Sequence, residues 1–136
     1  MSTPDPVRAL LNARGCPTEV VDGGLTGLVD LWERIVGLVG NSFALTLDDY
    51  LNDMDVRDLI EAALGAAAAQ TIAPVEGRLA ALDARLVGLT APCECLWGDD
   101  IADEEGLDSA IEWWYFRRPL DMGPELRDDL EKWGLV

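Results

Sequence analysis

The sequence has no histidine and a single lysine, Lys132. Without histidine the chain lacks the commonest general base and metal ligand of proteins, and neither a Ser-His-Asp nor a Cys-His catalytic arrangement can form. It also lacks a P-loop and a Gly-x-Gly-x-x-Gly motif, so nothing indicates binding of nucleotide phosphates. These absences argue against an enzyme, and we predict no catalytic residue and no cofactor.

Positive charge is also scarce. The chain has 10 Lys and Arg residues against 26 Asp and Glu residues, a formal net charge of −16. Nucleic acids and anionic membranes are both bound through Lys and Arg, so we expect no nucleic-acid partner and no membrane partner. The interpretations that remain are a basic protein partner, or an acidic surface that only keeps the protein soluble.

The three cysteines have no recognisable site spacing. One residue separates Cys93 from Cys95, whereas zinc knuckles and redox motifs use two, and Cys16 is distant in the sequence. We expect reduced thiols, with a strained Cys93–Cys95 disulfide as the rarer alternative. The N-terminus lacks the regions of a signal peptide, and no apolar run reaches the roughly 18 residues of a membrane span. The sequence therefore predicts a cytoplasmic protein.

Five aspartates within residues 48–58 raise the question of calcium binding. An EF-hand loop needs oxygen ligands at its first, third and fifth positions and glycine at its sixth. Starting from Asp49, the third position is Leu51 and the sixth is Met54, so the pattern fails, and it fails again within residues 99–108. Carboxylates at helix N-termini explain the first cluster more simply. We predict no metal site.

A chain of 136 residues, 49% of them apolar, is long enough to bury its own core. We predict a single helical domain over residues 1–136. Its fold class is mainly α, a compact bundle of five or six helices. A short β-hairpin and an extended aromatic segment near the C-terminus are the open alternatives for the remainder.

Capping residues and apolar spacing predict the first helices. Asp5 caps a helix over residues 6–14. After a connector over residues 16–24, apolar residues at three- and four-residue steps predict a core helix over residues 25–39, which a turn over residues 42–45 follows.

Thr46 and Asp49 have the spacing of a capping box, although glutamate or glutamine is the usual third-position partner. We expect them to begin a short helix. A second helix over residues 56–71 then follows, capped by Asp53 or Asp55.

The next helix carries a heptad-like seam. The alanine run 66–69 favours helix, and we expect Pro74 to break the chain and begin a new helix over residues 75–89. Four- and three-residue steps alternate along its apolar residues, which are Val75, Leu79, Leu82, Leu86 and Leu89. This seam predicts either a packed hairpin with the preceding alanine-rich helix or a homodimer interface.

From Thr90 onward, proline and glycine interrupt the chain repeatedly. Residues 99–108 carry six acidic side chains and predict an exposed loop. The last helix is expected over residues 124–133, with a buried face made of Leu126, Leu130 and Trp133.

An aromatic and cationic segment precedes that last helix. It reads Trp113, Trp114, Tyr115, Phe116, Arg117 and Arg118. Aromatic residues favour pleated packing, so we predict an extended segment paired with residues 94–97, and the alternative is a helix over residues 108–118. The aromatic side chains either fill the core, with the arginines paired to nearby acids, or form a recognition patch, since Trp, Tyr and Arg are common anchors of interfaces.

Two stretches of the chain, residues 47–57 and 113–119, resemble patterns in small uncharacterised bacterial proteins. The resemblance implies a bacterial origin and no established activity. Frequent alanine, and arginine in preference to lysine, suit a GC-rich genome.

We interpret the chain as a non-enzymatic acidic protein-interaction domain of the antitoxin or immunity-protein kind that binds a basic protein. Its candidate interaction residues are Trp113, Trp114, Tyr115, Arg117, Arg118, Asp99, Asp100, Asp103, Glu104 and Glu105. One alternative is a small-ligand-binding or weakly catalytic protein, whose pocket would be formed by Trp97, Trp113, Trp114, Arg117 and Arg118. The other is a homodimeric structural domain joined along the Leu79–Leu89 seam, so the chain is expected to be a monomer or a homodimer.

Overall fold

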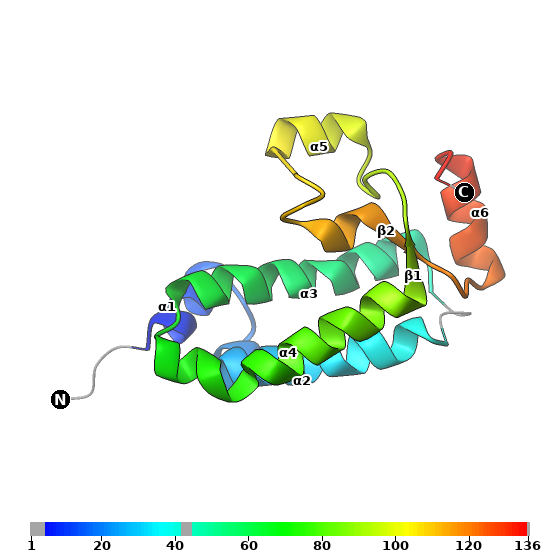
Figure 1. Cartoon of the computed structure of the whole chain (residues 1–136). Helices are drawn as coiled ribbons and strands as arrows, with labels where there is room; N and C mark the ends of the chain where they lie inside the picture. Colours follow the sequence, from blue (N-terminus) through cyan, green and yellow to red (C-terminus); the bar gives the residue numbers. More distant parts are fainter. Residues whose placement is uncertain (1–4, 42–44, 136) are drawn as a thin grey trace.

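The computed structural model describes residues 5–41 and 45–135, so the turn expected over residues 42–45 lies outside the described residues except for Leu45. The described residues form six α-helices, a short 3-10 helix and a two-stranded sheet (Figure 1). In chain order these are α1 (Pro6–Ala13), α2 (Thr18–Val39), α3 (Leu47–Ala66), α4 (Ala69–Leu89), β1 (Thr90–Pro92), α5 (Asp99–Glu105), η2 (Trp113–Phe116), β2 (Arg117–Pro119) and α6 (Pro124–Lys132). The predicted fold class, a mainly α bundle with a short antiparallel strand pair near the C-terminus, is confirmed.

The long helix α2 is the centre of the core. It packs against α1, α3 and α4, and its side chains Val29, Trp32 and Val36 are completely buried. The η2 segment lies on the outer side of α3, and α5 lies beyond it, so the C-terminal third forms a second layer over the bundle (Figure 1). None of the described helices is both long and apolar enough to cross a membrane.

The first helix begins where it was predicted, whereas the second begins earlier than the connector prediction allows. Asp5 caps α1 as expected, since its side chain accepts hydrogen bonds from the Val7 and Arg8 amides at 3.0 and 3.3 Å. Residues 18–23, however, are helical and belong to α2, so the connector predicted over residues 16–24 is wrong in most of its length. The chain bends within α2 at Gly24 (φ 58°, ψ −153°), a conformation that glycine alone adopts readily, and the helix continues beyond it.

The expected division of residues 47–71 into two helices is wrong. Thr46 and Asp49 form the predicted capping box, with N–O distances of 3.1 and 3.2 Å, but α3 then continues without a break to Ala66. The chain breaks at Ala67 and Ala68, inside the alanine run expected to be helical, and Pro74 lies inside α4. Alanine favours helix equally at each position, so the packing of both helices on α2 decides where the turn falls.

The heptad-like seam of α4 packs against other helices of the same chain. Val75, Leu79, Leu82 and Leu86 are buried in the core, where α4 packs against α2. On the neighbouring surface Arg78 of α4 pairs with Asp30 and Glu33 of α2, at 2.6 and 3.2 Å. The seam is therefore covered within the chain, mainly by α2 rather than by the preceding helix of the predicted hairpin. A homodimer is not needed to bury this seam, and it stays a prediction.

The C-terminal third differs most from expectation. Residues 99–105 form helix α5 instead of a loop, although none of its residues is buried. The aromatic residues 113–116 form a 3-10 helix rather than an extended segment, and β2 directly after them pairs with β1, in the register Thr90 to Pro119. The Leu96 amide of the predicted partner segment donates to the Tyr115 carbonyl, and the Cys93 amide just before that segment donates to the Phe116 carbonyl.

Trp133 is also placed differently from the prediction. Leu126 and Leu130 of α6 are buried as expected, whereas Trp133 is 70% exposed. The helix ends one residue before it, so Trp133 no longer follows the spacing of the buried face.

Candidate functional site

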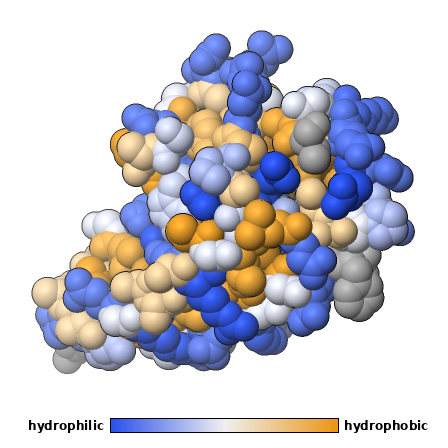
Figure 2. Space-filling view, turned by 45° about the vertical axis from the view of Figure 1, so that its right-hand side comes forward, coloured by the Kyte–Doolittle hydropathy of each residue, from blue (hydrophilic) through white to orange (hydrophobic). Residues whose placement is uncertain are grey.

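An open groove lies where the N-terminus of α3, the segment before α5 and the end of the chain meet. Its volume is about 680 Å³, within the range of protein binding sites. Figure 2 turns this end of the molecule forward and shows hydrophobic surface bordered by hydrophilic side chains. The groove is lined by Leu47, Asp48, Leu51, Glu94, Cys95, Leu96, Trp97, Gly98, Asp99, Asp100, Ile101, Trp133 and Leu135.

Three large apolar side chains of the groove remain in contact with solvent. Trp97, Ile101 and Trp133 are 38%, 39% and 70% exposed, beside the buried leucines of the floor. Scattered exposed apolar residues are common, but a group of them around one hollow is typical of a binding surface. We take the groove as the candidate site.

A glycine turn fixes the end of the chain against the groove. Gly134 adopts φ 70°, the Leu135 amide donates to the Leu130 carbonyl and the Gly134 amide donates to the Glu131 carbonyl. These two bonds form a Schellman motif, which ends a helix and turns the next residue back over it. Trp133 and Leu135 are thereby held on the wall of the groove.

The rim of the groove is acidic. Asp48, Glu94, Asp99 and Asp100 belong to it, and none of the lining residues that the structure describes is basic. Helix α5 extends this charge away from the groove through Asp103, Glu104 and Glu105, which are all exposed. The five predicted acidic candidates therefore lie on one helix, and two of them line the groove.

The aromatic segment supports the groove from behind. Trp114 and Tyr115 are almost completely buried, and the Tyr115 ring meets the edge of the Trp97 ring at a centroid distance of 6.2 Å. The Tyr115 hydroxyl donates a 2.5 Å hydrogen bond to Asp55 of α3. Burial, with that carboxylate beside the hydroxyl, holds the pKa of Tyr115 well above its usual range. The tyrosine is therefore a neutral donor that fixes the segment to α3.

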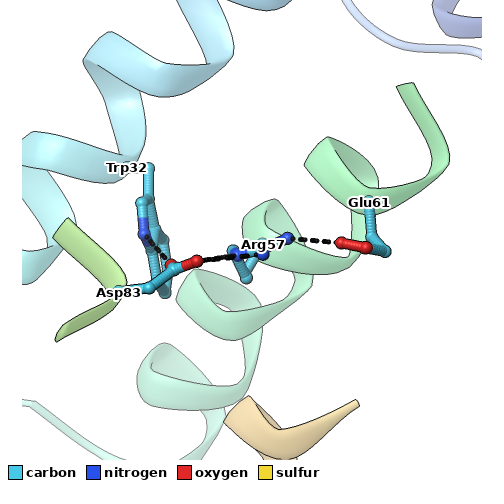
Figure 3. A network of polar contacts seen from close by, with 4 residues as sticks. All are labelled: Trp32, Arg57, Glu61 and Asp83. Carbon is cyan, nitrogen blue, oxygen red and sulfur yellow. Dashed lines mark hydrogen bonds and ion pairs between the residues drawn. The ribbon is translucent and has the colours of Figure 1, made fainter. Parts of the chain in front are cut away.

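Arg57 is the centre of a buried polar network (Figure 3). Its side chain is 7% exposed and binds Asp83 of α4 through two nitrogens, with the Nη2–Oδ2 distance at 3.0 Å. The Trp32 indole of α2 donates to the same carboxylate at 3.0 Å, and Glu61 receives a 3.2 Å bond from Arg57 Nη1. The guanidinium carbon also lies 4.9 Å from the centre of the Trp114 ring. This network joins three helices to the aromatic segment, and sequence reasoning missed it.

The arginine pair of the aromatic segment is not a free recognition cluster. Arg117 donates to the Thr90 hydroxyl at 2.8 Å and to the Thr90 and Val87 carbonyls at 3.1 and 3.2 Å. It thus closes the C-terminal end of α4 against β2. Arg118 is half-buried in the same strand, opposite Ala91. Neither arginine lines the groove.

Burial raises the pKa values of several titratable groups between α3 and the strand segment. Burial raises the pKa of the Cys93 thiol to about 11, so it is protonated at neutral pH, and burial with the nearby Asp49 raises the pKa of Asp53 to about 6. Tyr50 is completely buried, its pKa lies well above the usual range, and its hydroxyl has no hydrogen-bond partner among the described residues. This part of the chain is therefore poorly suited to nucleophilic chemistry.

The described cysteines are free thiols, as expected, with Cys95 buried and the other two half-buried. Within residues 5–41 and 45–135 no group of three or more acidic, cysteine or histidine side chains is arranged to hold a metal ion.

The structure brings together only part of the residues predicted for a site. Of the five residues of the expected small-ligand pocket, only Trp97 lines the groove, because Trp113 and Trp114 pack inward and the arginines are in the strand. Sequence reasoning missed Leu47, Leu51, Trp133 and Leu135. The one sequence feature that pointed toward the groove was the acidic cluster of residues 48–58, because its first member, Asp48, lines the groove.

The chain was compared with protein-family models, with curated proteins and with solved structures, and no match was found in any of the three comparisons. The resemblance of two short stretches to small bacterial proteins therefore stays a prediction.

Proposed function

We propose that the chain is a non-enzymatic interaction domain that binds a basic protein through its acidic C-terminal third. One observation carries the proposal: α5 presents five carboxylates on seven residues, buries none of them, and lies at the outer side of the molecule (Figure 1). Such a helix contributes little to the core, so its sequence is better explained by contact with a partner.

The charge distribution supports a cationic partner in particular. Acidic side chains on one surface accelerate the encounter with a basic protein and discriminate against acidic competitors. The antitoxin and immunity-protein class suits a small, highly acidic chain, and we propose this class for the protein. Free thiols suit a reducing compartment, which is the support for a cytoplasmic location in a bacterial cell.

Affinity capture with matched charge variants tests the proposal. The first variant neutralises α5 outside the groove, as D103N/E104Q/E105Q, and the control E19Q/D22N/E76Q removes the same charge from exposed positions of α2 and α4. The wild type and the control are expected to retain a basic protein at about 50 mM salt and to release it at about 1 M, where the Debye length is about 3 Å. The α5 variant is expected to retain much less.

Two results would contradict the proposal. One is a partner held equally well at high and low salt, because that contact does not depend on charge. The other is equal capture by the α5 variant and its control, because α5 then has no special role.

A further inference from the structure

We propose that the groove binds the apolar face of a cationic, amphipathic helix of the partner protein. The inference rests on the proposed function, which supplies the basic partner, and adds the kind of segment that the partner inserts. In this complex the groove would contact the apolar side chains of the partner helix, and α5 would attract the positive charge of the partner protein.

The apolar lining of the groove favours large apolar side chains on the partner helix. Trp97, Ile101 and Trp133 keep between 38% and 70% of their surface in water, and covering this apolar area stabilises a complex against the costs of association. Tryptophans around a hollow are common energetic anchors of interfaces. The volume of about 680 Å³ has room for several leucine-sized side chains.

The backbone around the groove favours a helix over an extended peptide. An extended peptide needs a free strand edge for its amides and carbonyls, and neither β1 nor β2 lines the groove. In the lining segment, the Leu96 amide already donates to the Tyr115 carbonyl, and the Gly98 amide to the Cys95 carbonyl. A helix satisfies its own backbone and needs only side-chain contacts, so it fits this surface.

The rim selects positive charge on that helix. Asp48, Glu94, Asp99 and Asp100 line the groove, and none of the described residues that line it is basic. The α3 N-terminus beside them is not a site for an anion, because the Leu47 amide donates to Asp129 at 3.0 Å and the Asp49 amide to Thr46 at 3.1 Å. Lysines or arginines flanking the apolar face of a bound helix would lie against the rim.

The same rim argues against a second copy of this chain as the occupant. In a two-fold interface the same patch meets itself, so each carboxylate group would face another. With a formal net charge of −16 on each copy, that arrangement is repulsive.

Three synthetic peptides of about 18 residues, five helical turns, test the inference. The first arranges leucine and lysine as an amphipathic helix, the second scrambles the same composition so that no apolar face remains, and the third replaces lysine with glutamate in the amphipathic order. Binding is measured by calorimetry and by the fluorescence of the chain's tryptophans, two of which line the groove. We expect the first peptide to bind at least about tenfold more tightly than either of the others.

Two variants locate the binding. W133A removes a mostly exposed anchor, and D48N/D99N/D100N neutralises the rim; each is expected to weaken the first peptide by about tenfold. The rim variant also flattens the salt dependence, whereas W133A leaves it unchanged. The control E19Q/D22N/E76Q is expected to bind like the wild type.

The outcomes separate this inference from the proposed function. Equal binding of the ordered and scrambled lysine peptides, or wild-type affinity in W133A, overturns the groove assignment and leaves an α5-dependent capture of a basic protein intact. Equal binding of the glutamate peptide overturns the role of the rim. A dimer in light scattering that W133A dissociates would assign the groove to a second copy.

Discussion

Arg57 lies where three helices and the aromatic segment meet, and its contacts show how one cation can organise an acidic chain. The guanidinium is nearly buried, but Asp83, Glu61 and the Trp114 ring surround it. Asp83 is in turn held by the Trp32 indole. Removing the cation leaves a partly buried carboxylate without its counter-charge, which is the costly way to break an ion pair.

We expect R57M to lower the free energy of unfolding by about 2–4 kcal/mol, measured by urea denaturation followed by circular dichroism. The double variant R57M/D83N should be more stable than R57M, because asparagine still accepts from Trp32 and leaves no unpaired charge.

Arg78 provides the matched control, since it also makes two ion pairs, with Asp30 and Glu33, which are 55% exposed. R78M should cost clearly less than R57M because water screens these pairs. If both substitutions destabilise the chain equally, the buried network has no special role.

At the level of single helices, local chemistry predicts the starts that a side chain caps and not the starts of α2 and α4, which have no side-chain cap. The caps at Asp5 and at Thr46 with Asp49 need only neighbouring residues, and both were predicted. The break between α3 and α4 was placed at Pro74 but lies at residues 67–68, where no residue signals a turn. Helix α5 was missed because its acidic composition resembles that of a loop, and it has no buried face to give periodicity.

The α3–α4 junction offers a test. Ala68 occupies the N-cap position of α4 with an extended conformation (φ −73°, ψ 153°) and no side-chain cap. A68S should supply an acceptor for the first turn and raise the free energy of unfolding by about 0.5–1 kcal/mol.

The matched substitution A81S, at an exposed position inside α4, should instead lower stability slightly because serine is a poorer helix former than alanine. Thermal denaturation of both variants and the wild type compares their stabilities. A destabilised A68S would mean that the junction is not a helix N-terminus.

At the scale of the whole molecule, excess negative charge and partly buried carboxylates make stability depend on pH. Burial raises the pKa of Asp53 to about 6 from 3.8, and burial also raises that of Asp58, which Arg14 opposes. The folded chain therefore binds these protons more tightly than the unfolded chain. Stability contributed this way is present at low pH and is lost as pH rises through the folded pKa.

We expect the free energy of unfolding to increase through Asp53 between pH 7 and pH 5, by at most about 1 kcal/mol because solvent screens this half-exposed carboxyl. D53N should stabilise the chain at pH 7 and flatten this dependence, whereas D22N, at an exposed position, should leave its slope unchanged. Urea titrations at the two pH values measure the free energy of unfolding of each variant. If its change with pH is the same in D53N as in the wild type, the dependence belongs to other carboxylates.

Composition and neighbouring residues are enough to predict the helical class, the acidic surface, the main helix caps and the apolar stripe of α2. Tertiary packing sets where the alanine run turns, that the aromatic residues pack inward, that Trp133 stays exposed, and that residues 47–51, 94–101 and 133–135 share one groove. The groove forms between segments that are far apart in the sequence. Their meeting depends on how whole helices bury their apolar faces, which no local pattern records.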